Sequence, residues 1–294
     1  NDTATTEIYT GEDTLSLHDA LPISAVMLDV HTGEILALAS QPTFDPNRLA
    51  GRITASHYDE VEKSGAWLNR ATQGLYPPGS TFKIVTAIAG MRKKVVDWDD
   101  ILECGAFYRV GDRDFPEHEP VGYGDVDLDK MLAISCNVWN YQIGLRAGPD
   151  ALAAEARRFG LDTPLLETAA SSDGPGATYT ELPYAASRGL VVPDREYKLR
   201  IKAGPWHDGD TANTSIGQGY LLTSPLHMAS FAASLARGET RTVPTIIHDP
   251  ARDGRHRGST PIGLNKAQLD AIRGGMVRCV EEGTGRSAHI QGLP

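Results

Sequence analysis

The stretch from Trp67 to Ala87, WLNRATQGLYPPGSTFKIVTA, contains the sharpest change of local structure in the chain. Tyr76-Pro77-Pro78-Gly79 ends any regular element, because two prolines lack backbone donors and glycine favours turns. Ser80 then opens the apolar run STFKIVTAIAGM. Proline before a helix start and serine in the first turn are both favoured, so the run predicts a buried helix that begins at Ser80 or just before it.

Lys83 follows Ser80 by three positions within this predicted helix. That spacing places the lysine amine on the same face as the serine hydroxyl. A serine hydroxyl attacks a carbonyl only when a base accepts its proton, and a desolvated lysine can be that base. A Ser-x-x-Lys arises by chance about once in a chain of this length. A capping serine beside a solvated lysine is therefore the better explanation of the motif if it is taken alone.

A second motif, Ser135-Cys136-Asn137, follows 55 residues after Ser80. A second hydroxyl can relay a proton between nucleophile, lysine and leaving group, and an asparagine amide can bind both a substrate amide and the lysine. Helix capping again explains these residue types.

Longer blocks of sequence decide between the catalytic and the helix-capping interpretation of the two short motifs. Besides the block from Trp67 to Ala87, the matching blocks are AVMLDVHTGEILALASQPTFDPN (25–47), SCNVWNYQIG (135–144) and NTSIGQGYLLTSPLHMA (213–229). In content, order and spacing they resemble the transpeptidase domain of the class B penicillin-binding proteins, of the penicillin-binding protein 2 type. The resemblance covers residues 25–294 and implies an α/β (α+β) fold, with a five-stranded antiparallel sheet flanked by helices. Only its first β-hairpin, residues 25–40, is expected here.

The resemblance also implies roles. Ser80 is the acylated nucleophile, Lys83 its general base, Ser135 a proton relay and Asn137 a substrate contact, an arrangement shared with class A β-lactamases. Supporting substrate contacts are implied for five further residues, for which a loop ion pair or a tight turn is an equally good explanation: Asn69, Arg70, Gly217, Gln218 and Gly219.

The implied activity is D,D-transpeptidation of peptidoglycan stem peptides without a cofactor, with β-lactams acylating the same serine. The implied setting is the periplasmic side of a bacterial inner membrane, with an anchor outside this stretch and the cell-wall elongation machinery as partner. Two alternatives share part of the chemistry. One is a serine β-lactamase or β-lactam sensor, and the other is a non-catalytic scaffold that binds elongation partners.

Two departures from the family pattern concern the end of the chain and its cysteines. The third motif, Lys-Thr-Gly or Lys-Ser-Gly, is absent, because Glu282 precedes Gly283-Thr284-Gly285. The motif is expected just after Pro294, so this polypeptide by itself is predicted to be inactive and to fold poorly.

Some members of the family carry a metal-ligand cluster near the second motif. Here Cys104, Glu117, His118 and Cys136 offer zinc-type ligands. However, Tyr123 stands where the family's histidine is expected, and cysteine is often simply a small buried residue. No metal ligand is therefore assigned.

Residues 1–24 stand apart from this pattern. Asn1–Thr10 and Thr14–Ile23 agree codon by codon with a common sequencing adapter, so the segment is interpreted as a translated artefact and excluded from the fold. Five of the 38 acidic residues fall there, against none of the 28 basic ones, so residues 25–294 have a net charge of −5. This acidic balance argues against a nucleic-acid partner. Three cysteines are too few for a disulfide framework.

Further elements follow from local signals. A hairpin is predicted around His31-Thr32-Gly33, an irregular polar segment over 104–123, and a long loop from Leu161 to about Gly219. Predicted helices cover 127–135, 138–146, Pro149 to Gly160, Pro225 to Gly238, and a stretch from Asn265, which with Gln268 resembles a capping box, to Gly283.

Overall fold

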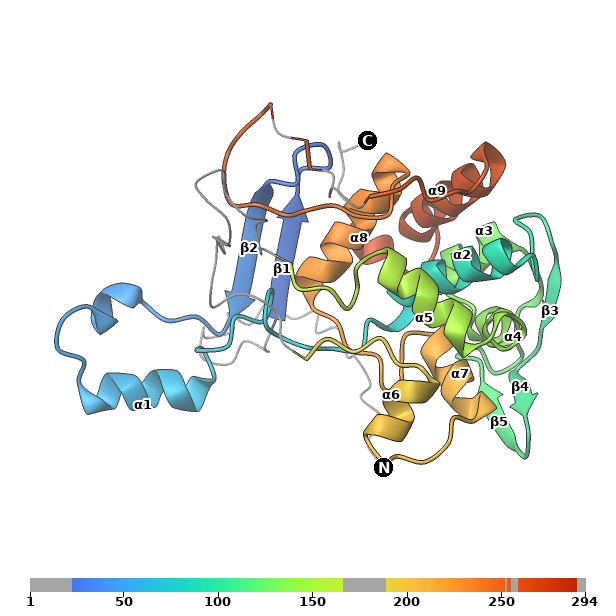
Figure 1. Cartoon of the computed structure of the whole chain (residues 1–294), viewed down its shortest axis with the longest axis horizontal. Coiled ribbons are helices and arrows are strands. Elements are labelled where there is room, and N and C mark those ends of the chain that lie inside the picture. The colour runs from blue at the N-terminus through green and yellow to red at the C-terminus, as the bar shows by residue number, and fades with distance from the viewer. Residues whose placement is uncertain (1–22, 166–188, 252, 255–258, 290–294) are drawn as a thin grey trace.

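The computed structural model describes residues 23–165, 189–251, 253–254 and 259–289. The predicted adapter segment therefore lies outside the described residues, except for Ile23 and Ser24. Figure 1 shows a β-hairpin towards one side and a group of helices at the other, with one helix between them. We call residues 23–76 the hairpin region. The helical body comprises α2 (Lys83–Lys93), α3 (Leu128–Ile134), α4 (Asn137–Ala147), α5 (Pro149–Arg158), α7 (Asp208–Ser215) and α9 (Lys266–Glu281).

The predicted hairpin is confirmed. Strands β1 (Ile23–Leu28) and β2 (Ile35–Gln41) pair antiparallel, with Val26 opposite Leu38. The turn between them is held by Asp29, whose carboxylate accepts hydrogen bonds from the backbone N–H groups of His31 and Thr32. β1 starts at Ile23, two residues before the predicted start of the domain.

One face of this hairpin packs on helix α8 (Pro225–Arg237), through Leu226. The predicted start of α8 at Pro225 and its end at Gly238 are both confirmed. Ser224 caps the first turn, and Gly238 adopts the left-handed conformation that ends a helix. In the described residues the main sheet consists of these two strands, and residue Glu34 adds a single parallel bridge to Thr245.

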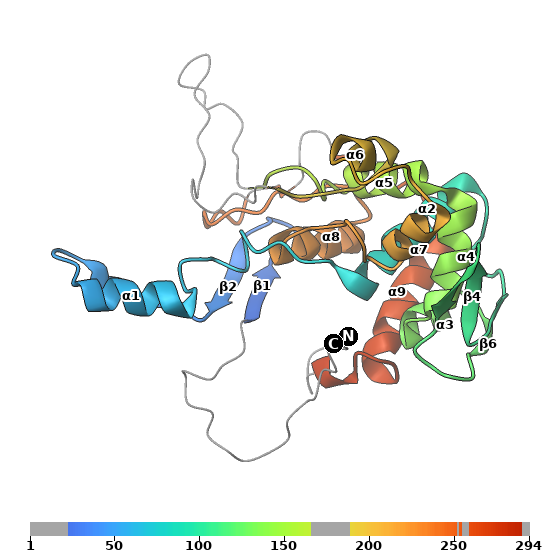
Figure 2. The same cartoon turned by 90° about the horizontal axis from the view of Figure 1, so that it is seen from below.

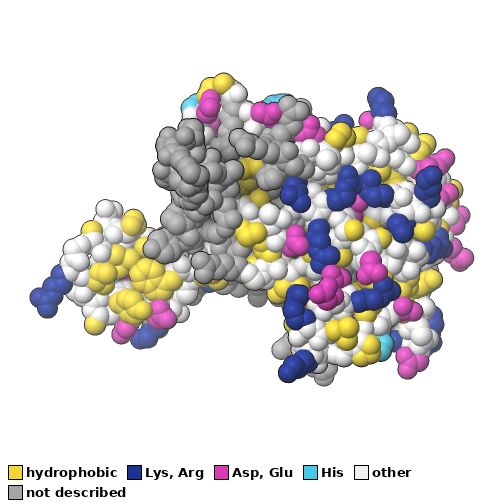
Figure 3. Space-filling view, in the orientation of Figure 1, with side chains coloured by type: hydrophobic (Ala, Val, Ile, Leu, Met, Phe, Trp, Pro, Cys, Tyr) yellow, Lys and Arg dark blue, Asp and Glu magenta, His cyan; other side chains and the backbone are white. Residues whose placement is uncertain are grey.

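A lobe projects from the hairpin beyond β2. It contains the short 3₁₀ helix η1 (Pro46–Leu49) and helix α1 (Ala55–Ser64), neither of which was predicted. Figures 1 and 2 show the lobe extending away from the rest of the molecule, and hydrophobic side chains gather on it in Figure 3. Phe44 and Tyr58 both contact the ring of Trp67 there.

The helical body is built around α2 (Lys83–Lys93). Nine of its eleven residues are buried, as expected for a helix surrounded on all sides. It follows a short 3₁₀ helix, η2 (Gly79–Phe82), so the predicted helix begins where expected but with a tighter first turn. Helices α3 (Leu128–Ile134), α4 (Asn137–Ala147) and α5 (Pro149–Arg158) confirm the predicted helical segments.

Glycine lets these helices approach closely. A Cβ atom at Gly90 of α2 would lie 2.4 Å from Ile143 of α4, and one at Gly144 of α4 would lie 2.4 Å from Ser215 of α7 (Asp208–Ser215). Helix α9 (Lys266–Glu281) packs on α3, and its predicted capping box of Asn265 and Gln268 is confirmed.

Two predictions were wrong. The segment 104–123, expected to be irregular, contains β4 (Phe107–Val110) and β5 (Arg113–Pro116), while β3 (Leu102–Cys104) ends at its first residue and β6 (Gly124–Val126) follows it. Strands of three or four residues, exposed on one side, are too short to show an alternating pattern.

The predicted loop over 161–219 contains α6 (Arg195–Arg200) and α7, and its residues 166–188 lie outside the described part of the chain. Both helices are short and polar, and their ends depend on caps rather than on an apolar stripe. The antiparallel strands and covering helices nevertheless agree with the predicted α/β (α+β) class. Every helix in the described part of the chain is too short or too polar to span a membrane.

Candidate active site

Ser80 lies in the 3₁₀ turn that leads into α2. The backbone N–H of Lys83 donates to the carbonyl oxygen of Ser80, closing a turn of three residues. Side chains three apart in a 3₁₀ helix are eclipsed, so the hydroxyl and the amine share one face more closely than in an α-helix. Ser80 is exposed, whereas Lys83 is 1% exposed. The turn therefore presents a hydroxyl to solvent, three positions before a buried lysine.

The lysine amine joins the two sequence motifs. Lys83 Nζ donates to Ser135 Oγ at 3.0 Å, to the Ser135 carbonyl oxygen at 2.5 Å and to Asn137 Oδ1 at 2.7 Å. Three acceptors match the three N–H groups of an ammonium ion. Ser135 ends α3 in the left-handed conformation, with φ +58°. This unusual backbone directs both its carbonyl and its hydroxyl to the same amine.

The electrostatics of the site favour a lysine that can lose its proton near neutral pH. Burial lowers the pKa of Lys83 from 10.5 to about 8, and the negative charge of Glu117 opposes this effect. A base with a pKa close to the working pH is the most effective proton acceptor.

Gly217, Gln218 and Gly219 form the turn that ends α7, next to the residue before Ser80. Gly217 N–H donates to the Thr214 carbonyl and Gln218 N–H to the Asn213 carbonyl, the pattern of a Schellman cap. The Gly217 carbonyl accepts from the N–H of Gly79, and a Cβ atom at Gly217 would lie 2.1 Å from the Gly79 carbonyl oxygen. The tight turn considered from the sequence is therefore present, and it supports the residue before Ser80.

Asn69 and Arg70 make their polar contacts elsewhere. Asn69 Oδ1 accepts from the N–H of Ala71 and of Thr72, while the Arg70 guanidinium donates to the Gly65 and Leu68 carbonyls. The N–H of Arg70 donates to Ser40 Oγ at the end of β2. These contacts stabilise a loop and fix it to the hairpin. Substrate contact by either residue stays a prediction.

The residues considered as zinc ligands bond to one another. Cys136 Sγ donates to Glu117 Oε2 at 3.1 Å, His118 Nδ1 lies 2.7 Å from Glu117 Oε1, and Tyr123 Oη lies 2.7 Å from His118 Nε2. Across the described ranges of the chain, no group of three or more His, Cys, Asp or Glu residues is arranged to hold a metal ion.

Residues 23–294 match the family described as the penicillin binding protein transpeptidase domain. The chain belongs to this family. It is 32% identical over 273 residues to the peptidoglycan D,D-transpeptidase MrdA of Acinetobacter baumannii, covering 89% of this chain and 38% of that protein. It is 32% identical over 243 residues to the peptidoglycan D,D-transpeptidase PbpA of Mycobacterium tuberculosis, covering 76% of this chain and 42% of that protein. The chain thus spans less than half the length of these curated relatives.

Solved structures of penicillin-binding proteins are similar throughout the described fold. One is a complex between penicillin-binding protein 2 and MreC from Helicobacter pylori, with a TM-score of 0.75 and 25% identity over 92% of this chain and 47% of that one. Another is Pseudomonas aeruginosa penicillin-binding protein 2 in complex with WCK 5153, with a TM-score of 0.72 and 28% identity over 90% of this chain and 56% of that one.

Two parts of this penicillin-binding protein domain support the site without belonging to either motif. Glu117 was considered only as a metal ligand, yet it contacts the start of α4. The N–H of Thr284 donates to the carbonyl of Ala133, two residues before Ser135, and a Cβ atom at Gly283 would lie 2.0 Å from that oxygen. No local signal in the sequence indicates either contact, because the partners are far apart along the chain.

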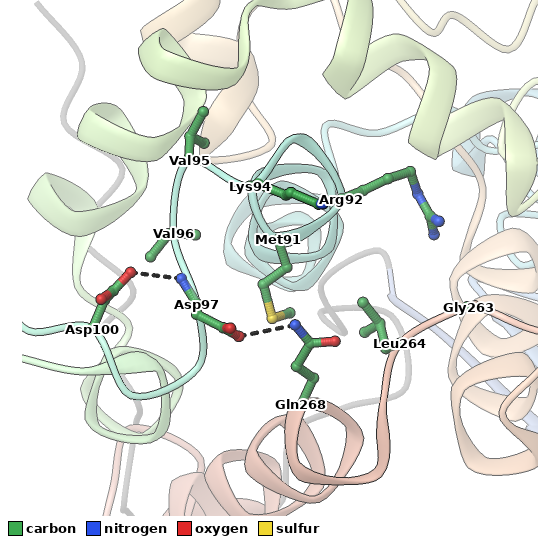
Figure 4. A pocket seen from close by; sticks show the side chains of 10 residues that line it. All are labelled: Met91, Arg92, Lys94, Val95, Val96, Asp97, Asp100, Gly263, Leu264 and Gln268. Carbon is green, nitrogen blue, oxygen red and sulfur yellow. Dashed lines mark hydrogen bonds between the residues drawn. The ribbon is translucent and has the colours of Figure 1, made fainter.

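A cavity of about 580 Å³ opens at the opposite end of α2. Figure 4 shows Met91, Asp97, Asp100 and Gln268 around it, with Gln268 donating to Asp97. None of the predicted site residues of this penicillin-binding protein domain lines this cavity. The predicted reaction centre lies instead at the N-terminal end of α2, where Ser80 is exposed.

Proposed function

We propose that the described domain carries the acyl-transfer centre of a peptidoglycan D,D-transpeptidase. The observation that carries the proposal is the buried amine of Lys83, one turn after the exposed Ser80 and within hydrogen-bond distance of both Ser135 and Asn137. Ser80 is the nucleophile, Lys83 the general base, Ser135 the proton relay and Asn137 the substrate contact. The proposed transpeptidase domain comprises residues 25–294, with residues 1–24 outside it.

The hydrogen bonds of Lys83 suggest how the proton moves. A neutral amine has two N–H groups and one lone pair, so one of its three contacts must reverse when the proton leaves. The carbonyl oxygens of Ser135 and Asn137 cannot donate, whereas the Ser135 hydroxyl can. Neutral Lys83 is therefore held by two carbonyl acceptors and connected through Ser135 to the substrate side of the site.

The reaction then follows as two acyl transfers. Lys83 accepts a proton from the Ser135 hydroxyl, which takes up the proton of Ser80, and the Ser80 oxygen forms a bond to the carbonyl carbon of the penultimate D-alanine of a stem peptide. The bond to the terminal D-alanine breaks, and its nitrogen takes a proton through Ser135. The amine of a neighbouring stem peptide next attacks the ester, forming the crosslink and returning the proton to Ser80. A β-lactam reacts at the first step, because opening its ring gives the same ester.

The supporting residues have narrower roles in this proposal. Asn137 Oδ1 is bonded to Lys83, which leaves its amide N–H groups for a substrate carbonyl. Gly217, Gln218 and Gly219 contribute a backbone edge beside Ser80 for the bound peptide. Asn69 and Arg70 contribute to substrate binding at the end of β2.

We extend the proposal to the setting of the protein. Its substrates are peptidoglycan stem peptides, its inhibitors β-lactams, and its partners components of cell-wall elongation. MreC is bound by the related penicillin-binding protein 2 of Helicobacter pylori. Action on peptidoglycan calls for a periplasmic domain at the bacterial inner membrane. The β-lactamase and sensor alternatives are not favoured, because the relatives reported above are transpeptidases.

Acylation by a fluorescent penicillin tests this function on the whole protein encoded by the gene, with the 294-residue chain measured alongside. We expect one label per protein at Ser80, located by mass spectrometry, and none in Ser80→Ala. Ser64→Ala, at an exposed serine of α1, is the matched control and should label fully. The chain alone should stay unlabelled if the third motif is required. Labelling that persists in the Ser80→Ala variant would refute the assignment of Ser80 as the nucleophile.

The lifetime of the label separates the remaining alternatives. An acyl-enzyme that persists indicates a transpeptidase, whereas fast turnover of penicillin indicates a β-lactamase. The scaffold alternative would be favoured if the whole protein is never labelled and its Ser80→Ala variant still supports cell shape.

A further inference from the structure

Glu117 is a buried carboxylate that has no role in the two acyl transfers proposed above. It follows β5, and its side chain is fully shielded from solvent. One oxygen accepts from Val138 N–H at 2.9 Å and from Cys136 Sγ at 3.1 Å, and the other accepts from His118 N–H at 3.0 Å, with His118 Nδ1 at 2.7 Å. A buried carboxylate is costly unless donors surround it, and here the donors come from two separate segments.

Two of these donors lie on either side of Asn137. Cys136 precedes it and Val138 follows it, at the first turn of α4. The N-terminal end of a helix carries a partial positive charge, so an anion is favourable at this position. Lys83 holds the same segment from the other side, through Ser135 and Asn137. The Ser135–Val138 segment is therefore clamped between a buried cation and a buried anion.

The two charges also act on each other. Burial raises the pKa of Glu117, but hydrogen bonds from His118, from the N–H groups of Val138 and Asn137, and from Cys136 outweigh this and lower the pKa to about 2. Glu117 is thus ionised whenever the protein is folded at neutral pH. Its charge acts on Lys83 and favours the protonated lysine.

We propose that Glu117 is a positioning residue of the acyl-transfer site: it fixes the Ser135–Val138 segment opposite Lys83 by hydrogen bonds and provides the counter-charge of that lysine. The inference rests on the proposed function in one respect, namely that Lys83 acts as the base. Replacing the Glu117 carboxylate by a neutral group of the same shape should therefore make Lys83 lose its proton at lower pH. It should also displace Ser135 and Asn137 from their positions beside Lys83.

The variant that tests this is Glu117→Gln, and Glu155→Gln is its matched control. Glu155 is another buried carboxylate, with 2% of its side chain exposed, and it pairs with Arg92 and Arg158 instead of facing Lys83. The first measurement is the titration of Lys83, followed by NMR of ¹³C-labelled lysine and assigned with Lys83→Arg. We expect the pKa of Lys83 to fall in Glu117→Gln and to stay unchanged in Glu155→Gln. An unchanged Lys83 pKa in Glu117→Gln, or equal shifts of that pKa in both variants, would refute the counter-charge role of Glu117.

The second measurement is the pH profile of acylation by a fluorescent penicillin in the whole protein. In Glu117→Gln we expect the plateau rate to fall roughly tenfold, because misplaced catalytic groups lose rate steeply. We also expect the rise in rate to occur at lower pH. A loss of rate with no movement of the profile would indicate a structural role only and overturn the proposal.

Glu117→Asp provides the conservative variant should Glu117→Gln not fold. It keeps the charge one methylene further away, so Lys83 should titrate near its normal pH while the plateau rate still falls. A Lys83 pKa lowered as much by Asp as by Gln contradicts the proposal. If neither the parent protein nor any variant is acylated by the penicillin, the proposed function fails. The titration of Lys83 then still decides whether Glu117 is its counter-charge.

Discussion

The helical body and the hairpin region are packed in different ways. Nine of the eleven residues of α2 are buried, and α4 has eight buried residues, including Trp139 at 0% exposure. By contrast, neither β1 nor β2 contains a buried residue, and Met27 and Leu36 are more than half exposed. The groups proposed for catalysis that need fixed positions belong to the densely packed region, where side chains cannot move without displacing neighbours.

The largest expected effect lies in the helical body. Trp139→Ala should lower the free energy of unfolding by about 4 kcal/mol, because it leaves a large cavity between packed helices. Urea denaturation measures this. Trp139→Phe is the control and should cost far less, since it keeps an aromatic ring and removes an indole N–H that has no partner in the described structure. Equal losses in the two variants would contradict tight packing around α4.

The second effect tests the contact between the end of α7 in the helical body and the turn that carries Ser80. Gly217→Ala places a methyl group 2.1 Å from the carbonyl of Gly79 and forces alanine into a backbone with φ +74°. We expect a loss of about 3 kcal/mol in unfolding free energy, from left-handed strain together with the clash. Gly238→Ala is a matched control, because it has φ +73° but nothing within 4 Å of the added methyl group. A larger loss at Gly238 would argue against the contact.

The hairpin should respond less to a comparable truncation. Leu226 of α8 is 1% exposed and packs on Val26, Leu28 and Ile35, which are only partly buried. Those strand side chains have room to relax, so Leu226→Ala should cost about 2 kcal/mol, the lower end for such a change. Denaturation of Leu226→Ala beside Trp139→Ala makes the comparison directly. A loss at Leu226 as large as that at Trp139 would show that the two regions are packed alike.

The smallest effect concerns pH. With the pKa of Lys83 near 8, the neutral fraction rises roughly tenfold between pH 7 and pH 9, and the acylation rate should rise with it. His248→Asn, which removes the histidine beside Glu34 of the hairpin region, should leave this profile unchanged. A flat profile would indicate that Lys83 is not the base.

The same pKa has a consequence for folding. Between pH 8 and 10.5 the unfolded chain binds more protons at Lys83 than the folded chain does. This group therefore makes stability rise with pH across that window. Lys83→Met should remove the dependence.

Local signals predicted the elements that carry them. The prolines before Ser80, the Ser-Pro start of α8 and the Asn265–Gln268 capping box all act within one turn of the chain, so the sequence displays them directly. Helix α7 and strands β3 to β6 escaped prediction because each is too short to build a periodic pattern. They are stabilised instead by contacts with distant segments, such as that between Gly144 and Ser215.

The sequence by itself determined which chemical groups are available. The Ser80–Lys83 spacing, the Ser135–Asn137 motif and the long blocks around them were sufficient to name the family and the proposed reaction. Only the tertiary structure decided how those groups meet. It buries Lys83 and brings Ser135 to it across 52 residues, and it places the Glu117 carboxylate against the start of α4. Burial and through-space charge determine the pKa of the lysine, and neither is a property of residues that are close in sequence.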